Sequence, residues 1–287
     1  MRDFEFVEPA TLAQASSTIA ELGDDCRVIA GGTALMLAMR QRMLNPTHLV
    51  SLDKLDVLRG IEFDSSVGLR IGALTKHAEV AGSKAVQQHY PMLAHMAGNM
   101  ANPQVRNQGT IGGNLCYADP ATDPPACLMA LDAQVVLSGL KTQRTLSIKE
   151  FLVDYYSTAL RPDEVVVEVR VPPPCGVGHY VRHLRTAAEH RPLVNVAVRF
   201  IKEAGHCHDA RVVVGASTAV PTRFARAEEY LQGKPLTLET AVAAARIVAA
   251  DVEPISDLRG TGEYRREVVQ VVVRRALIEL IGLPAGQ

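Results

Sequence analysis

The chain has no tryptophan, and aromatic residues make up only 5% of its 287 residues. Any bound cofactor therefore has to be held mainly by backbone groups and small side chains. Long apolar runs are missing too: the longest, residues 241–250, contains Arg246 and is far shorter than the roughly 20 residues that cross a bilayer. Residues 1–5 lack the apolar core of a signal peptide, so we expect a cytoplasmic protein without a membrane span.

An excess of charge of one sign is also missing, because the formal net charge is -1. This balance excludes nucleic acid as the main partner, since phosphate binding needs a basic face. The cysteines are scattered, odd in number and nowhere arranged as Cys-x-x-Cys: Cys26, Cys116, Cys127, Cys175 and Cys207. This pattern is typical of reduced thiols and not of a disulfide framework. It also excludes a conventional cysteine-ligated iron–sulfur cluster within this chain.

What the chain does contain is enough apolar material for a sizeable core, with 47% hydrophobic residues. Its length favours two domains. The clearest boundary is the triple proline at 172–174, followed by Gly176 and Gly178, because proline and glycine together interrupt regular structure. We predict an N-terminal domain over residues 1–175, with lobes at about 1–57 and 58–175, and a C-terminal domain over 176–287.

Strand and helix signals follow this division. Thr11 is a predicted N-cap for a helix that ends at Gly23; Thr75 is predicted to cap another. In the N-terminal domain the pattern predicts strands at 26–30, 47–52, 69–74, 133–137 and 165–171, and helices at 34–42, 92–100 and 126–131. A glycine- and asparagine-rich stretch, 102–114, and a proline-rich stretch, 119–125, interrupt them. In the C-terminal domain it predicts strands at 179–185, 194–201 and 210–215, then helices at 225–231, 238–249 and 264–281. Strands followed by helices indicate an α+β domain.

A first glycine motif lies between a predicted strand and a predicted helix. It comprises Val28, Ile29, Ala30, Gly31, Gly32, Thr33, Ala34 and Leu35. A helix start has free N–H groups and a partial positive charge, and glycine allows an anion to approach the backbone closely. The motif is neither a P-loop nor the dinucleotide fingerprint. It predicts a phosphate cradle, although a tight turn that binds nothing would have the same sequence.

A second glycine motif spans residues 104–114 and ends in Thr110, Ile111, Gly112, Gly113 and Asn114. Such a loop offers consecutive backbone donors, which form a concavity for anions. A glycine-rich surface loop is the alternative interpretation. Two cradles within one domain suit a diphosphate better than a single phosphate.

These motifs, together with the stretch Ala118 to Pro125, closely resemble the FAD-binding medium subunits of the molybdenum hydroxylases, the family of xanthine dehydrogenase and aerobic carbon monoxide dehydrogenase. The resemblance runs nearly end to end and includes residues 158–160, 164 and 171–172, then 221–223 and 255–266. It implies a two-lobed FAD-binding domain of the vanillyl-alcohol-oxidase (PCMH) type. A smaller domain with a three-stranded antiparallel sheet and helices would follow it.

The resemblance also implies roles for single residues. Residues 28–35 would wrap the FAD pyrophosphate, and residues 110–114 would form the second wall. Asp123 would lie near the ribityl or adenosine portion, Met100 beside the cofactor, and Arg182 would reach the flavin ring. Many members of the family have an acidic or polar residue where this chain has Ala34, which removes one polar contact.

The family's partners complete this expectation. A large subunit with a molybdopterin cofactor hydroxylates the substrate, and a small subunit relays electrons through two [2Fe–2S] clusters. The FAD subunit passes them to NAD, oxygen or a quinone-linked acceptor. We therefore expect an electron-transfer subunit within a dimer of heterotrimers.

Two other functions stay open at this point. A stand-alone FAD-dependent oxidoreductase would need a catalytic acid or base over the flavin, and the sequence does not point to one. A non-catalytic nucleotide-binding protein would need only the glycine loops. We expect no metal site, because His206 and His208 around Cys207 are more typical of a hairpin turn than of a ligand set. Tyr155, Tyr156 or Tyr180 could shield one face of a flavin.

Overall fold

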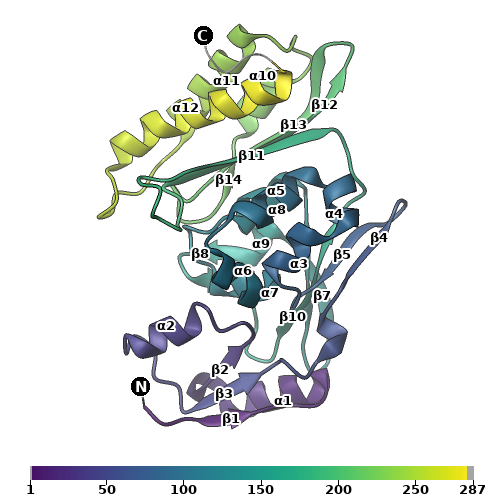
Figure 1. Ribbon diagram of the computed structural model, residues 1–287, viewed down its shortest axis with the longest axis vertical. Helices are drawn as coiled ribbons and strands as arrows, with labels where there is room; N and C mark the ends of the chain where they lie inside the picture. The colour runs from purple at the N-terminus through teal and green to yellow at the C-terminus, as the bar shows by residue number, and fades with distance from the viewer. Residues whose placement is uncertain (1, 283–287) are drawn as a thin grey trace.

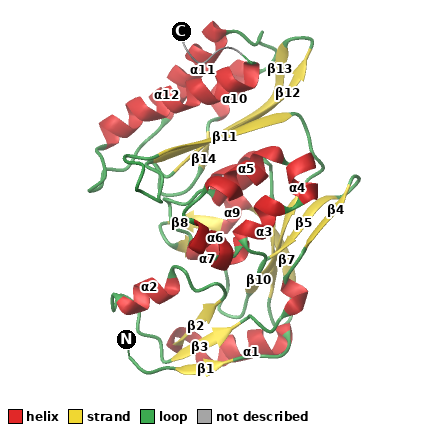
Figure 2. Ribbon diagram, in the orientation of Figure 1, coloured by secondary structure: helices red, strands yellow, loops and turns green. Residues whose placement is uncertain are grey.

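The computed structural model describes residues 2–282 of the chain. Three sheets follow one another along the long axis of the molecule, with the N-terminus at one end and helix α12 at the other (Figure 1). Helices separate the middle sheet from the last one and also cover the last sheet from outside (Figure 2). The boundaries 1–175 and 176–287 remain a prediction, and residues 1 and 283–287 lie outside the described part.

The first lobe is a small parallel sheet of order β1-β3-β2, with helix α1 packed against β2 and β3. Its elements are β1 Glu5–Val7, α1 Leu12–Leu22, β2 Cys26–Ile29, α2 Leu35–Arg40 and β3 His48–Ser51. The predicted cap is confirmed: the Thr11 hydroxyl accepts a hydrogen bond from the N–H of Gln14, 3.2 Å away. Gly23 ends α1 with a positive φ of 51°, a conformation that glycine adopts at little cost.

The second lobe is an antiparallel sheet of order β4-β5-β10-β6-β7 that packs against short helices. Its strands are β4 Ile61–Asp64, β5 Gly68–Gly72, β6 Gln134–Ser138, β7 Gln143–Ser147 and β10 Val165–Val171, and β8 Leu152–Asp154 pairs with β9 Ser157–Thr158 as a separate hairpin. Its helices are α3 His77–Gly82, α4 Lys84–His89, α5 Pro91–Asn99, α6 Pro103–Gln108, α7 Ile111–Tyr117, α8 Pro124–Ala130 and α9 Ile148–Phe151. The sequence patterns did not predict β4, β7, β8, β9, α4 or α9, all of which are short.

Two expectations for this lobe were wrong in detail. The stretch 102–114 is not a loop, because it forms α6 and most of α7, whose caps are the side chains of Asn102 and Thr110. The cap of α3 is not Thr75 but Lys76. The Thr75 hydroxyl instead donates to the carbonyl of Gly60 at 3.0 Å, which fixes the turn before the helix.

The C-terminal part is an antiparallel sheet of order β11-β12-β13-β14. Its elements are β11 Val177–His183, β12 Val194–Glu203, β13 His206–Gly215, β14 Thr222–Arg223, α10 Ala225–Leu231, α11 Leu238–Asp251 and α12 Gly262–Ile281. The three predicted strands are present, and two-residue β14 adds a fourth at the edge. Val194 to Phe200 are all buried: one face packs under α10, α11 and α12, and the other against α5 and α8. Only two of residues 194–200 are polar, Asn195 and Arg199, and both donate hydrogen bonds to backbone carbonyls of the second lobe.

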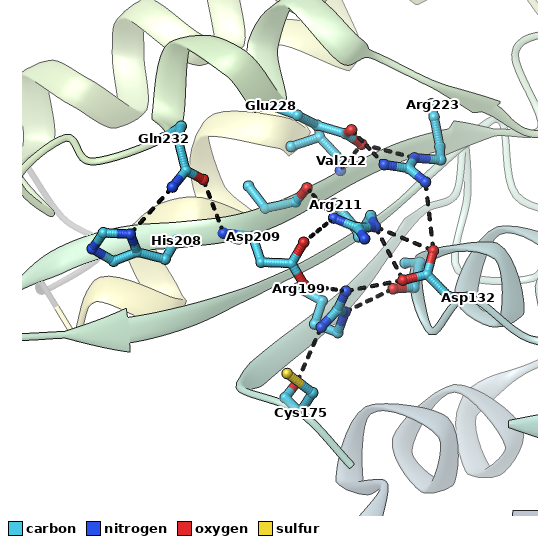
Figure 3. Close-up of polar contacts among 12 residues, drawn as sticks. Asp132, Cys175, Arg199, His208, Asp209, Arg211, Val212, Arg223, Glu228 and Gln232 are labelled. Carbon is cyan, nitrogen blue, oxygen red and sulfur yellow. Dashed lines mark hydrogen bonds and ion pairs between the residues drawn. The ribbon is translucent and has the colours of Figure 1, made fainter. Parts of the chain in front are cut away.

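A polar cluster ties the second lobe to this sheet. Asp132, in the turn between α8 and β6, pairs with Arg199, Arg211 and Arg223 at 3.1, 3.0 and 3.4 Å (Figure 3). Asp209 also pairs with Arg199 and Arg211, and Glu228 pairs with Arg223. The Arg199 side chain is only 7% exposed, so its charge depends on these carboxylates for compensation.

Candidate functional site

A cavity of about 640 Å³ lies between the two lobes of the N-terminal part. Its walls come from the segment 27–52 of the first lobe and from the segments 73–117 and 156–166 of the second. This volume lies within the range of sites for organic cofactors, roughly 300–1,000 Å³. Thirteen of the sixteen residues predicted to bind the cofactor line it: Val28, Ile29, Ala30, Gly31, Gly32, Thr33, Ala34, Leu35, Met100, Thr110, Gly112, Gly113 and Asn114.

The first glycine motif presents free backbone donors to this cavity. Among the described residues, the N–H groups of Gly31, Gly32, Thr33 and Ala34 have no hydrogen-bond partner, and the first bond after them joins Met36 N–H to the Gly32 carbonyl. Helix α2 begins only at Leu35, and Ala34 caps it without a side-chain bond. With just six residues in the helix, we attribute the anion-binding capacity of this turn to the free N–H groups rather than to a helix dipole.

The two glycine motifs meet at Gly31. A Cβ built at Gly31 would overlap the carbonyl oxygen of Gln108 and lie 2.9 Å from the Cα of Gly109. A Cβ built at Gly113 would lie 3.8 Å from that of Ala30. The strand-to-helix turn of the first lobe therefore rests directly on the segment that leads into α7, and a side chain at position 31 would separate them.

The second motif supplies fewer free donors than the sequence-based expectation: within the described part of the chain, only the Thr110 N–H among residues 110–114 has no hydrogen-bond partner. Ile111 N–H donates to the Thr75 carbonyl and Gly112 N–H to the Ala73 carbonyl at 3.0 and 2.9 Å. The N–H groups of Gly113 and Asn114 both bond to Thr110. Formation of α7 consumes these groups, so the second wall offers close approach and side chains instead of a nest of amides.

Two buried polar atoms beside the cavity have no partner within the described part of the chain: Oδ1 of Asn114 and Nδ1 of His77. A buried polar group without a hydrogen bond costs roughly 1–3 kcal/mol, so both are groups that a polar ligand can satisfy. The free amides of the first motif and the glycine contact at position 31 fit a ligand that carries a diphosphate, and the acceptor Oδ1 of Asn114 fits a hydroxyl group of such a ligand. FAD is such a ligand.

Three predicted residues do not line the cavity. Ile111 is buried in the core of the second lobe. Asp123 and Arg182 pair with each other, Nε to Oδ1 at 3.2 Å, where α8 meets β11. The Tyr180 hydroxyl donates to the same carboxylate at 2.6 Å, and burial raises the pKa of Asp123 to about 6, against the effects of Arg182 and Tyr180. Arg182 also donates to the carbonyls of Asn99 and His190, so it ties the sheet to residues next to the cavity.

Sequence reasoning missed several cavity residues that come from the second lobe. Tyr117 and Tyr156 line the cavity and stack edge-to-face with ring centroids 5.3 Å apart. Glu164 lines it as well, but both carboxylate oxygens accept hydrogen bonds from Arg144 at 2.7 Å, which lowers the pKa of Glu164. Tyr156 was one of three tyrosines considered for a flavin face; Tyr180 is buried beside Asp123 and does not reach the cavity.

The remaining observations concern metals and membranes. No group of three histidine, cysteine or acidic side chains within residues 2–282 is placed to hold a metal ion. Cys207 is buried in β13, and His206 begins that strand. No helix in the same range has the length and apolar character needed to cross a membrane.

Comparison with known proteins decides the family. Residues 2–174 match the family described as the FAD binding domain in molybdopterin dehydrogenase, and residues 179–280 match the CO dehydrogenase flavoprotein C-terminal domain. The chain belongs to the FAD-binding subunits of the molybdenum hydroxylases. This confirms the resemblance that the glycine motifs indicated, and with it the fold class.

Relatives of this FAD-binding subunit span its whole length. It is 34% identical to the carbon monoxide dehydrogenase medium chain of Hydrogenophaga pseudoflava, over 96% of each chain. It is 28% identical to the xanthine dehydrogenase FAD-binding subunit of Escherichia coli O157:H7, over 100% of this chain and 99% of that one. The solved carbon monoxide dehydrogenase of H. pseudoflava, which lacks the Mo-pyranopterin moiety, superposes with a TM-score of 0.92 at 34% identity, over 96% of both chains.

Proposed function

We propose that this FAD-binding subunit transfers electrons within a three-component hydroxylase. They would come from [2Fe–2S] clusters of a small partner subunit, supplied in turn by a large molybdopterin subunit. They would leave to an external acceptor: NAD, oxygen or a quinone-linked carrier. The observation that supports FAD as the carrier is the row of four unpartnered N–H groups at 31–34, which faces a cavity of cofactor size.

When bound, FAD supplies the redox chemistry, since it can take up and release electrons one or two at a time. The protein's part is binding and orientation. The amides of Gly31 to Ala34 would hold phosphate oxygens, and Asn114 would add a side-chain contact from the opposite wall. Met100, Leu160 and Val165 give the cavity apolar walls that exclude water from the ligand.

A stand-alone oxidoreductase is less well supported, because it needs a free acid or base that a substrate can reach, and His77, the one histidine among the residues that line the cavity, is only 2% exposed. Glu164 is the one carboxylate among the residues that line it, and Arg144 engages both of its oxygens. The cavity therefore offers binding groups and no free carboxylate for substrate chemistry.

Titration of the purified chain with FAD tests the cofactor. We expect flavin absorption that survives desalting at about one flavin per chain, and quenched flavin fluorescence. The chain should be loaded both alone and as the assembled complex, since partners can stabilise the site. If neither form retained flavin, the proposal would be wrong.

The electron-transfer role needs a second experiment. The tagged chain is purified from its source, and the eluate is assayed for iron, molybdenum and flavin. We expect all three to co-elute, and substrate added without oxygen to bleach the flavin absorption only in this complex. Substrate turnover by the isolated FAD-loaded chain would instead favour the stand-alone oxidoreductase.

The external electron acceptor is identified by running the last proposed step, electron transfer from the flavin to the acceptor, in reverse. The FAD-loaded chain is mixed anaerobically with NADH, and the flavin absorption is followed by stopped flow. Rapid bleaching assigns NAD as the acceptor. If NADH leaves the flavin oxidised, reoxidation of the reduced chain by oxygen and by a soluble quinone distinguishes the other two.

A further inference from the structure

His77 stands out among the residues around the cavity because its burial has no evident structural reason. It is the first residue of α3 and only 2% exposed, and its side chain lines the cavity. Within residues 2–282 neither ring nitrogen makes a hydrogen bond, and Nδ1 is fully buried. A histidine that served only to fill the core would normally have its ring nitrogens satisfied by the protein.

The surroundings of His77 place it between the two glycine motifs. Its backbone N–H donates to the Gly109 carbonyl at 3.1 Å, so α3 is joined to the segment that leads into α7. A Cβ built at Gly109 would lie 3.3 Å from Cδ2 of His77 and 3.4 Å from Oγ1 of Thr33. Cδ2 of the imidazole and the Thr33 hydroxyl therefore both lie on the side of Gly109 where a Cβ would project, next to the free amides of the first motif.

Its protonation state suits a neutral contact. Burial lowers the pKa of His77 to about 4, so the ring is uncharged at neutral pH. A neutral imidazole carries one N–H donor and one acceptor nitrogen. Since the second motif spends most of its amides on the start of α7 and leaves only the Thr110 N–H free among residues 110–114, the second lobe offers few backbone donors here, and His77 is a side-chain group able to add one.

We propose that His77 is a positioning residue of the cofactor site, whose imidazole N–H donates to a phosphate oxygen of the bound dinucleotide beside Thr33. The inference rests on the proposed function, because it takes FAD as the ligand. His77 completes the cradle: the first lobe contributes backbone amides and the second contributes this ring, while Oδ1 of Asn114 accepts from a hydroxyl group of the ligand. It takes no part in electron transfer, so its effect is on cofactor affinity.

Two substitutions separate this role from a structural one. His77→Leu removes both ring nitrogens at similar size, and His77→Asn keeps a donor near the position of Nδ1. A hydrogen bond to a charged group contributes about 1.5–3 kcal/mol, so we expect the FAD dissociation constant to rise roughly 10- to 100-fold in the leucine variant. His77→Asn should keep most of the FAD affinity that His77→Leu loses. His206→Leu, at the exposed start of β13, is the matched control and should bind FAD like the wild type.

The stability of the FAD-free protein is the second readout. If His77 serves the ligand, removal of its unpartnered nitrogens leaves the Tm of the FAD-free leucine variant equal to or above that of the wild type. A structural histidine predicts a lower Tm instead. In ¹⁵N-histidine-labelled protein, the His77 ring signals, assigned by their absence in His77→Asn, should shift on addition of FAD.

The outcomes distinguish the two proposals. If wild type and control bind FAD and His77→Leu binds it equally well, or if the ring signals do not move, the role of His77 is refuted while the cofactor assignment stands. If the wild type itself fails to bind FAD, alone and in the complex, the proposed function fails and this inference fails with it.

Discussion

A methyl group at position 31 is the sharpest probe of how the cofactor cavity is built. The Gly31→Ala side chain would overlap the Gln108 carbonyl oxygen and lie 2.8 Å from its carbonyl carbon. Both atoms belong to the backbone, and the next residue, Gly109, lies equally close. The contact therefore cannot be relieved by a rotamer change, and the turn at 31–34 has to move away from the second lobe.

The size of the effect follows from this geometry. Overpacking a rigid contact costs about 1–3 kcal/mol, and we expect the upper end because backbone meets backbone. Gly32→Ala differs, because its cost in unfolding free energy comes from the backbone. Gly32 has a positive φ of 68°, which costs a residue with a Cβ about 1–2 kcal/mol. The atoms nearest to its built Cβ belong to flexible side chains at 3.3 Å. Gly82→Ala is the control, since nothing lies within 4 Å and a helical alanine is favoured over glycine by about 1 kcal/mol.

Urea denaturation of the FAD-free variants and FAD titration measure the two consequences. We expect Gly31→Ala to be the least stable of the three and to lose at least tenfold in FAD affinity, because its free amides no longer face the second lobe. Gly82→Ala should match or exceed the wild type in both. Equal stability and affinity of Gly31→Ala and wild type would refute the account of this contact.

Three further predictions concern other parts of the fold. Asp132→Ala should cost about 1–3 kcal/mol of unfolding free energy, because the buried Arg199 loses one of its two carboxylate partners and keeps only Asp209. Removing the carboxylate of the exposed pair that Asp251 makes with Arg226 should cost less than about 1 kcal/mol; urea denaturation of both variants checks this. The pKa of Asp123 is raised from 3.8 to about 6, so the folded protein holds a proton that the unfolded chain releases. The stability should therefore fall by about 3 kcal/mol as the pH rises through that window, and Asp123→Asn should flatten that part of the profile. Cys116 is an exposed cysteine that lines the cavity. Bound FAD should protect it from slow alkylation, followed by mass spectrometry, but leave the exposed Cys175 reactive; equal labelling of Cys116 with and without FAD would contradict the site.

Much of this architecture is legible in the sequence, and the reasons for the misses are physical. Val165 to Val171 has the predicted bounds because the strand pattern ends at a proline there, and the bounds of Ala225 to Leu231 are also as predicted. The stretch 102–114 was misread as a loop since glycine and asparagine are poor helix formers. Tertiary contact decides the structure of this stretch instead. A Cβ built at Gly112 would lie only 2.7 Å from the Cβ of Ala73, so position 112 has to be glycine for α7 to pack against Ala73.

The cofactor site shows the same division between residues that local sequence predicts and residues that tertiary contacts place. Twelve of the thirteen cavity residues were found through the two glycine motifs, whose chemistry is local in sequence, and Met100 was placed by the resemblance. Asp123 and Arg182 were placed by resemblance alone, and their mutual pairing between α8 and β11 depends on how distant segments meet. His77 carried no signal, since a single histidine after a strand is common and only its orphaned nitrogen distinguishes it.

The sheet β11–β14 has consequences for how this protein can be divided or recombined. Its strand β12 is covered by α12 on one side and by α8 on the other, so the two halves that match separate families share one interior. Cutting the chain at the triple proline would expose valines and Tyr180 to water and invite aggregation. A chimera that joins this N-terminal part to a relative's C-terminal part would have to exchange the side chains on both sides of the interface between α8 and the sheet β11–β14 together. Over evolution, the two parts are expected to change in concert.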